Sequence, residues 1–203
     1  SSDLTVIPDR IEAGTFLAAV LAVGGRVKLE NVISGHLSAV LAKFGEVGAT
    51  IADQEGSLWI ERDPQAALRA TDVRALPYPG FPTDLQPQMA AVLTQARGMS
   101  LVTALVFDSR FTYVEELQRL GANIRTEGRS AVIEGPTALT GAQVRAHDLR
   151  AGAALVIAGL AASGETEITG TEHLDRGYEE LVDKLAALGA QVFRGRLKSE
   201  ALV

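Results

Sequence analysis

One pattern recurs three times along this chain: an amphipathic segment that ends on glycine and runs directly into a β-type stretch. The copies are LSAVLAKFGEVG at residues 37–48, VEELQRLG at 114–121 and YEELVDKLAALG at 178–189. Apolar residues occur at helical spacing in each, and a glycine closes a helix because it readily takes the left-handed backbone conformation. Since the pattern returns about every 70 residues, we expect three copies of one α/β unit.

A second kind of helix precedes each of these segments and is much more apolar. We expect these helices at residues 10–23, 85–96 and 149–162, each stopping close to a glycine (Gly24, Gly98 and Gly164). A helix rich in Ala, Val and Leu on every side is usually buried on every side. Strands are then expected at residues 26–32, 100–106 and 165–169.

Two short strands should follow each amphipathic helix, and a further strand should lead into the next unit. The expected strands are 50–52, 57–60, 68–74, 123–126, 130–134 and 143–146, with glycine-containing turns DQEG and EGR inside the hairpins. The order βαβαββ predicts an α/β fold. We expect a single domain over residues 1–203, an inverse α/β barrel with its apolar helices inside. Its units span about 4–62, 68–135 and 141–195, and a tail follows at 196–203.

The third unit is incomplete. After a strand expected at residues 191–194 only GRLKSEALV remains, so the second hairpin strand and the strand after it are missing. Either the repeat simply decays here, or strands from elsewhere in a longer native chain complete it. We favour the second interpretation, because an exposed sheet edge is a liability that proteins usually cover.

Composition excludes several classes of function. The net charge of −6 argues against a nucleic-acid surface, which needs clustered Lys and Arg. The chain has no cysteine, which rules out disulfides, thiolate zinc sites and cysteine nucleophiles within it, and its three histidines lack metal-ligand spacing. Its longest apolar run, residues 153–162, is far shorter than the roughly 20 residues of a membrane span. The start lacks the features of a signal peptide, so we expect a cytoplasmic protein.

An aspartate stands just before each apolar helix: Asp9, Asp84 and Asp148. Aspartate is a preferred N-cap residue, so a purely structural role is the simplest interpretation, above all for Asp9. Asp84 and Asp148 can combine capping with function, because the ends of repeated helices can point into one cleft, where a carboxylate can accept a proton. Prolines surround Asp84 in PYPGFPTDLQP, which indicates either a structural turn or a loop held in one shape.

Three arginines lie at helix starts or in loops that follow strands: Arg110, Arg150 and Arg176. A single surface arginine is usually just solvated, but three at unit junctions of an acidic protein favour an anion site. Asp175 can instead pair with a neighbour or cap the helix that follows. No glycine-rich phosphate loop and no Ser-His-Asp arrangement accompanies these arginines.

The segments IPDRIEAGTF, PGFPTDLQPQ, VFDSRF, HDLRAGAALVIAGL and HLDRGYEELVDKLAALGA resemble the second domain of the UDP-N-acetylglucosamine 1-carboxyvinyltransferases. The resemblance runs from about Val6 to Phe193. FPTD, DLRA and DRGYE distinguish this family from the shikimate-pathway enolpyruvyl transferases, which share the repeat architecture.

The resemblance implies a transferase that moves the enolpyruvyl group of phosphoenolpyruvate to the 3-hydroxyl of UDP-N-acetylglucosamine without a metal or organic cofactor. It assigns Asp84 to the reacting hydroxyl and Thr83 to positioning of the sugar nucleotide. Val106 and Phe107 correspond to the uridine side. The residues that correspond to the surroundings of phosphoenolpyruvate are Arg110, Arg150, Arg176 and their acidic partner Asp148.

The resemblance also implies a partner: the N-terminal domain of the same enzyme, which carries a mobile loop with Cys or Asp and a phosphoenolpyruvate-binding Lys. We therefore expect this chain to be inactive alone, with its substrate cleft lying between the two domains. Two other interpretations stay open. One is a related enzyme that uses shikimate 3-phosphate, and the other is a non-catalytic domain kept for partner binding or regulation.

Overall fold

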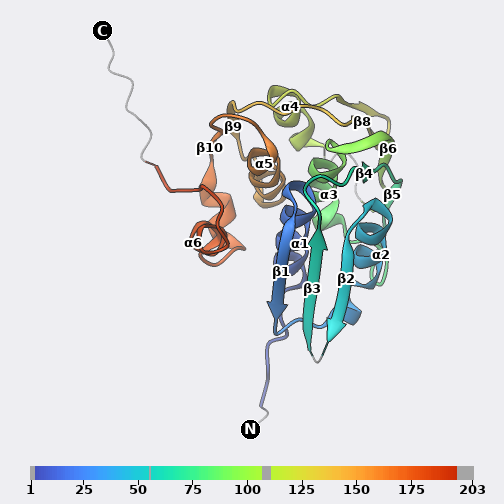
Figure 1. Ribbon diagram of the computed structural model, residues 1–203, viewed down its shortest axis with the longest axis vertical. Coiled ribbons are helices and arrows are strands. Elements are labelled where there is room, and N and C mark those ends of the chain that lie inside the picture. Colours follow the sequence, from blue (N-terminus) through green and yellow to red (C-terminus); the bar gives the residue numbers. More distant parts are fainter. Residues whose placement is uncertain (1–2, 55, 107–110, 196–203) are drawn as a thin grey trace.

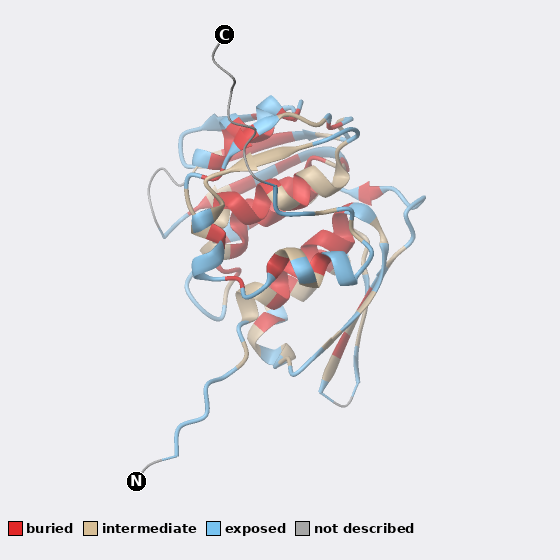
Figure 2. Ribbon diagram, turned by 90° about the vertical axis from the view of Figure 1, so that its left-hand side faces the viewer, coloured by how far each residue is buried: buried red, intermediate tan, exposed pale blue. Residues whose placement is uncertain are grey.

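The computed structural model describes residues 3–54, 56–106 and 111–195. Three helices lie side by side at its centre and contact one another (Figure 1): α1 (Arg10–Val23), α3 (Gln86–Leu93) and α5 (Leu149–Ala161). All eight residues of α3 are buried, as are most residues of the other two helices (Figure 2). The prediction that the most apolar helices lie inside is therefore confirmed. None of the described helices is both long and apolar enough to cross a membrane.

An antiparallel sheet covers α1. Its strands follow the order β1 (Gly25–Glu30), β3 (Ser57–Arg62) and β2 (Thr50–Gln54). Ile60 of the central strand lies between Val27 of β1 and Ile51 of β2. The short η1 (Ser34–Leu37) leads into α2 (Ser38–Val47), which buries Val40, Phe44 and Val47 on one face. This amphipathic helix has the predicted character, because its other residues stay at the surface.

A second sheet covers α3. Its strands are β4 (Leu68–Arg69), β5 (Val73–Ala75), β6 (Ala96–Ala104), β8 (Ser130–Gly135) and β7 (Ile124–Glu127). The first two run parallel to β6, whereas β6, β8 and β7 are antiparallel. The amphipathic helix α4 (Thr112–Arg119) buries Tyr113, Val114 and Leu117 beside this sheet.

The expected boundary between helix 85–96 and strand 100–106 is wrong. The helix ends at Leu93, and β6 already begins at Ala96. Strand pairing overrides helical propensity here, because Gly98 lies opposite Gly135 in the sheet and takes a φ of 114°. A Cβ on Gly135 would lie 2.5 Å from the carbonyl oxygen of Ala96, so only glycine lets the two backbones approach this closely.

The last part of the chain wraps around α5. Here β9 (Gln143–Arg145) and β10 (Glu167–Thr169) form a parallel pair, followed by η3 (Thr171–Arg176) and α6 (Leu181–Ala187). A small core of its own joins α6 to α1 and α5, with Phe16, Ala153, Leu174, Tyr178, Leu181 and Leu185. The ion pair between Lys184 Nζ and Glu12 Oε1, at 2.7 Å, reinforces this contact.

Two expectations for this region are wrong. The helix expected from residue 178 starts at Leu181, because Glu180 takes a left-handed conformation with a φ of 50°. The strand expected at 191–194 does not form, since a strand needs a partner and β10 pairs only with β9 within the described part of the chain. Residues 196–203 lie outside the described residues.

Candidate active site

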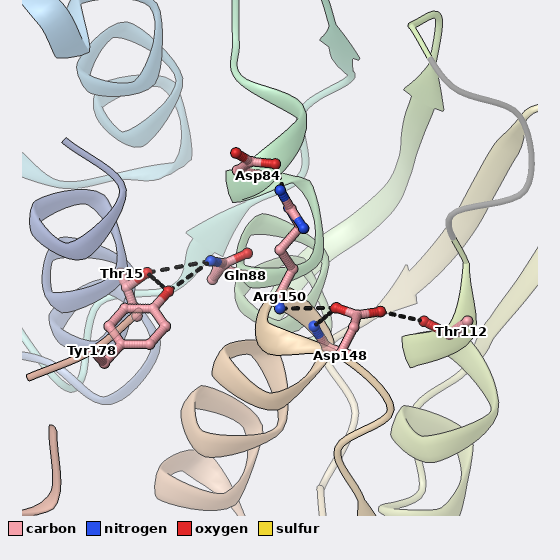
Figure 3. Close-up of polar contacts among 8 residues, drawn as sticks. Thr15, Asp84, Gln88, Thr112, Asp148, Arg150 and Tyr178 are labelled. Carbon is pink, nitrogen blue, oxygen red and sulfur yellow. Dashed lines mark hydrogen bonds and ion pairs between the residues drawn. The ribbon is translucent and has the colours of Figure 1, made fainter. Parts of the chain in front are cut away.

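The starts of three helices surround one small cavity. It has a volume of about 230 Å³ and is lined by Thr83, Gln86, Pro87, Thr112, Tyr113, Asp148, Arg150 and Ala151. These residues come from the beginnings of α3, α4 and α5, which are far apart in sequence (Figure 3). Helix N-termini carry unpaired N–H groups and partial positive charge, so together they favour an anionic occupant.

Asp148 caps α5, as the sequence predicts. Its Oδ1 accepts hydrogen bonds from the backbone N–H groups of Arg150 (2.8 Å) and Ala151 (2.9 Å). Its Oδ2 accepts a further bond from the hydroxyl of Thr112, at 3.1 Å (Figure 3). The carboxylate therefore fixes the start of α5 and ties it to the first residue of α4.

Asp84 does not cap α3, which corrects the expectation that it combines capping with function. It lies in the 3₁₀ turn η2 (Thr83–Leu85), whose backbone amides are bonded without it: Leu85 N–H to the Pro82 carbonyl, and Gln86 N–H to Thr83. Pro87, in the first turn of α3, has no N–H to cap. The carboxylate of Asp84 therefore takes no part in capping α3.

One partner of Asp84 is Arg150. The Nε of Arg150 donates to Oδ1 of Asp84 across 66 positions of sequence (Figure 3). This bond raises the pKa of the guanidinium, against the opposing effect of partial burial. The side chains are 33% and 36% exposed, so a ligand can reach both partners.

A buried Tyr–Gln pair forms one wall of the cavity. The amide Nε2 of Gln86 donates to the hydroxyl of Tyr113 at 3.3 Å. Burial raises the pKa of Tyr113, so its hydroxyl is neutral at physiological pH. This pair joins α3 to α4 and keeps the wall in place.

The remaining predicted residues fall into three groups. Thr83 lines the cavity, so the structure brings it together with Asp84, Asp148 and Arg150. Val106 lies on the exposed stretch after β6, and Arg176 is exposed at the end of η3. Phe107 and Arg110 lie outside the described residues.

Asp175 pairs with Arg194, so of the two roles considered for Asp175 the structure shows pairing with a neighbouring side chain.

Sequence reasoning missed the polar residues that support this site. They are Thr15, Gln86, Gln88, Thr112, Tyr113 and Tyr178. A usable signal was present: Gln86 and Gln88 interrupt a helix that is otherwise apolar, and buried polar side chains need partners. Among residues 3–54, 56–106 and 111–195, no cluster of three or more metal-ligating side chains occurs.

The arrangement suits reactions between a hydroxyl and an anion. A carboxylate with exposed surface can accept a proton, and a planar guanidinium beside it can bind a phosphate or carboxylate group through two parallel hydrogen bonds. Because both groups are held by helix starts, they need little rearrangement to act together.

Comparison with known proteins identifies similar sequences. A family model described as EPSP synthase (3-phosphoshikimate 1-carboxyvinyltransferase) matches residues 1–185. UDP-N-acetylglucosamine 1-carboxyvinyltransferase 1 of Caldanaerobacter subterraneus subsp. tengcongensis is 54% identical over 190 residues, which are 94% of this chain and 45% of that protein. UDP-N-acetylglucosamine 1-carboxyvinyltransferase 2 of Bacillus subtilis is 52% identical over 98% of this chain and 46% of its own length. The chain thus spans less than half the length of these relatives.

Solved structures show the same fold. The enolpyruvyl transferase NikO from Streptomyces tendae superposes with a TM-score of 0.81 at 28% identity, covering 93% of this chain and 44% of that one. EPSP synthase from Acinetobacter baumannii gives a TM-score of 0.63 at 21% identity, and the match covers 88% of this chain and 44% of the synthase chain. The second likeness speaks for the fold alone.

Proposed function

Because this chain belongs to the EPSP synthase (3-phosphoshikimate 1-carboxyvinyltransferase) family, we propose that it is the C-terminal portion of a UDP-N-acetylglucosamine 1-carboxyvinyltransferase. The enzyme transfers the enolpyruvyl group of phosphoenolpyruvate to the 3-hydroxyl of the sugar nucleotide. The observation that carries the proposal is the pairing of Asp84 with Arg150 beside the cavity. The high identity to relatives of that name supports this acceptor over shikimate 3-phosphate.

In this mechanism Asp84 accepts the proton of the sugar hydroxyl. The hydroxyl oxygen bonds to C2 of phosphoenolpyruvate while C3 takes up a proton, which gives a tetrahedral intermediate. C3 then loses a proton as the C2–O bond to phosphate breaks, and the double bond returns in the product. Arg150 holds Asp84 in place before the substrates arrive, and its guanidinium stays cationic throughout.

Positive charge must face both the phosphate and the carboxylate of phosphoenolpyruvate. We assign this task to Arg110, Arg150 and Arg176, with Asp148 as the acidic partner that orients the start of α5. Thr83 helps to position the sugar nucleotide, and Val106 and Phe107 line its uridine side. The proposed chemistry assigns no step to a metal or organic cofactor.

The rest of the enzyme supplies the other wall of the cleft. We infer that this chain is one domain, an inverse α/β barrel of three βαβαββ units at about 4–62, 68–135 and 141–195. The third unit is incomplete and is completed by the N-terminal part of the same protein. The coverage of about 45% of the relatives' length supports a second domain, without which this chain is inactive.

On this proposal the enzyme acts in the cytoplasm at the first committed step of peptidoglycan synthesis. It thereby serves cell-wall biogenesis, cell shape and cell division. Phosphoenolpyruvate and UDP-N-acetylglucosamine are its two substrates.

Phosphate release tests the proposal. The full-length protein is incubated with phosphoenolpyruvate and either UDP-N-acetylglucosamine or shikimate 3-phosphate, and Asp84→Ala and Arg150→Ala are measured beside it. We expect phosphate release when the acceptor is UDP-N-acetylglucosamine and none when it is shikimate 3-phosphate, and we expect both variants to be inactive. If only shikimate 3-phosphate supports release, the choice of acceptor is overturned. If a protein of residues 1–203 releases phosphate without the rest of the enzyme, the need for the other domain is overturned.

A further inference from the structure

A cluster of three buried polar side chains lies beside the candidate active site (Figure 3). The hydroxyls of Thr15 and Tyr178 are 2.8 Å apart, and Gln88 Nε2 lies 3.2 Å from the first and 3.4 Å from the second (Figure 3). Thr15 belongs to α1, Gln88 to α3, and Tyr178 to the turn between η3 and α6. None of the three is more than 4% exposed, so water does not compete for these bonds.

The direction of each bond follows from the donors available. The Thr15 hydroxyl donates to the carbonyl of Ile11 at 2.9 Å, so it accepts the proton of Tyr178. The oxygen of Tyr178 in turn accepts from the Gln88 amide. Gln88 Oε1 is buried without a hydrogen-bond partner among the described residues. The Tyr178 hydroxyl thus donates to α1 at Thr15 and accepts from α3 at Gln88, which ties its segment to both helices.

Tyr178 also ends a short segment that contains Arg176. The backbone N–H groups of Gly177 and Tyr178 both donate to the carbonyl of Leu174, at 3.1 and 2.9 Å. The segment packs against the first turns of α5: a Cβ on Gly177 would lie 2.7 Å from the side chain of Leu149, and one on Gly152 would lie 3.0 Å from Leu174. Arg176 is therefore carried by a segment that touches the start of α5, where Arg150 lies.

We propose that Tyr178, Thr15 and Gln88 are positioning residues, which set the place of Arg176 relative to Asp84 and Arg150. This inference rests on the proposed function, in which Arg176 binds the anionic substrate. Gln88 follows Asp84 by four positions, so α3 and its leading turn carry both the reacting carboxylate and the anchor. Directional hydrogen bonds fix one arrangement of the segment, whereas an apolar contact allows it to slide.

A double-mutant cycle in the full-length protein tests the kinetic part. Tyr178→Phe, Arg176→Ala and the double variant are compared by kcat/KM for phosphate release. We expect Tyr178→Phe to lower kcat/KM by about tenfold or more, since small misplacements of binding groups are costly. In the Arg176→Ala background the same change should add no further loss. An equal loss in both backgrounds, or no loss at all, overturns the proposal.

Thr94→Val is the matched control. It removes an equally buried hydroxyl from the other end of α3, where Thr94 donates to the carbonyl of Ala91. We expect it to lower the unfolding temperature as Tyr178→Phe does, while kcat/KM stays unchanged. A similar kinetic loss in Thr94→Val would mean that general destabilisation explains the effect.

Hydrogen exchange tests the anchor without any substrate. The amides of Gly177 and Tyr178 should exchange at least tenfold faster in Tyr178→Phe and Thr15→Val than in Thr94→Val. Unchanged exchange shows that the cluster does not hold the segment. If the wild-type protein releases no phosphate from the proposed substrates, the proposed function fails, and exchange still decides whether the anchor exists.

Discussion

The backbone N–H of Arg145 donates to the buried carboxylate of Glu116 at 3.0 Å. Since the N–H of Ala146 faces β10 and donates to Thr169, that of Arg145 faces away from the sheet. Glu116 Oε1 also lies 3.3 Å from Nε2 of His147, the residue that precedes Asp148 in sequence. One side chain of α4 therefore takes the place of a neighbouring strand at the edge of β9.

Glu116→Ala should destabilise the protein by about 1 kcal/mol, because it removes the acceptor of the part-buried N–H of Arg145. Glu116→Gln should cost less, since its amide oxygen still accepts from Arg145. Urea unfolding measures both, with the exposed neighbour substitution Glu115→Ala as control. Equal stability of Glu116→Ala and Glu115→Ala would contradict the role of this contact.

Asp148→Asn should separate capping from charge. Asparagine caps helices as well as aspartate, so the unfolding temperature should stay nearly unchanged, whereas Asp148→Ala should cost about 1 kcal/mol. Phosphate release should nevertheless fall in Asp148→Asn, because the amide group cannot replace the negative charge near Arg150 or accept from Thr112 as Oδ2 does. Full activity in Asp148→Asn would show that Asp148 serves only as a cap. Asp63→Asn, which alters an exposed turn, is the control for both readouts.

Two glycines should respond to alanine in opposite directions. Gly45 lies inside α2 with open space around it, so Gly45→Ala should stabilise the protein by about 0.5–1 kcal/mol. Gly135→Ala should destabilise it by about 2 kcal/mol, since the new methyl group meets the carbonyl oxygens of Ala96 and Thr94. Thermal unfolding gives both values, and a stabilising Gly135→Ala would refute the close backbone approach.

Glu46 should contribute to stability only above acidic pH. Hydrogen bonds from Lys43 and Thr71 hold the pKa of Glu46 below its usual 4.5. A lowered folded-state pKa adds stability above about pH 4.5, and this stability is lost as the pH falls through the folded value. Because Glu46 is half exposed, Glu46→Gln should cost only about 0.5 kcal/mol at pH 7. Urea unfolding should show wild type more stable than Glu46→Gln at pH 7, and the two proteins equally stable at pH 3.

Periodicity predicted the central helices because burial on every side leaves a plain mark in the sequence. α1 has the predicted bounds, and α5 ends one residue early. The start of β6 was not predictable in the same way, since Ala96 and Arg97 pair with β4, more than 25 residues earlier in the chain. Local pattern could not reveal that pairing, and it likewise suggested a strand at 191–194 that has no partner among the described residues.

The candidate site shows the same division. Capping by Asp148 follows from neighbouring residues, and the sequence predicted it. The pairing of Asp84 with Arg150, and of Tyr178 with Thr15, depends on how helices from three parts of the chain meet. Asp84, Asp148 and Arg150 were still singled out as candidates, because charged residues at helix starts stand out in an otherwise apolar sequence.

The mutual contact of α1, α3 and α5 has a consequence for folding kinetics. Their apolar surfaces face one another, so α1 cannot complete its burial until α5, more than 100 positions later, has been synthesised. Contacts between such distant segments slow folding, and the chain exposes apolar helices while it emerges from the ribosome. We expect the first half of this chain to depend on chaperones during translation. It should fold cooperatively only after α5 has been synthesised.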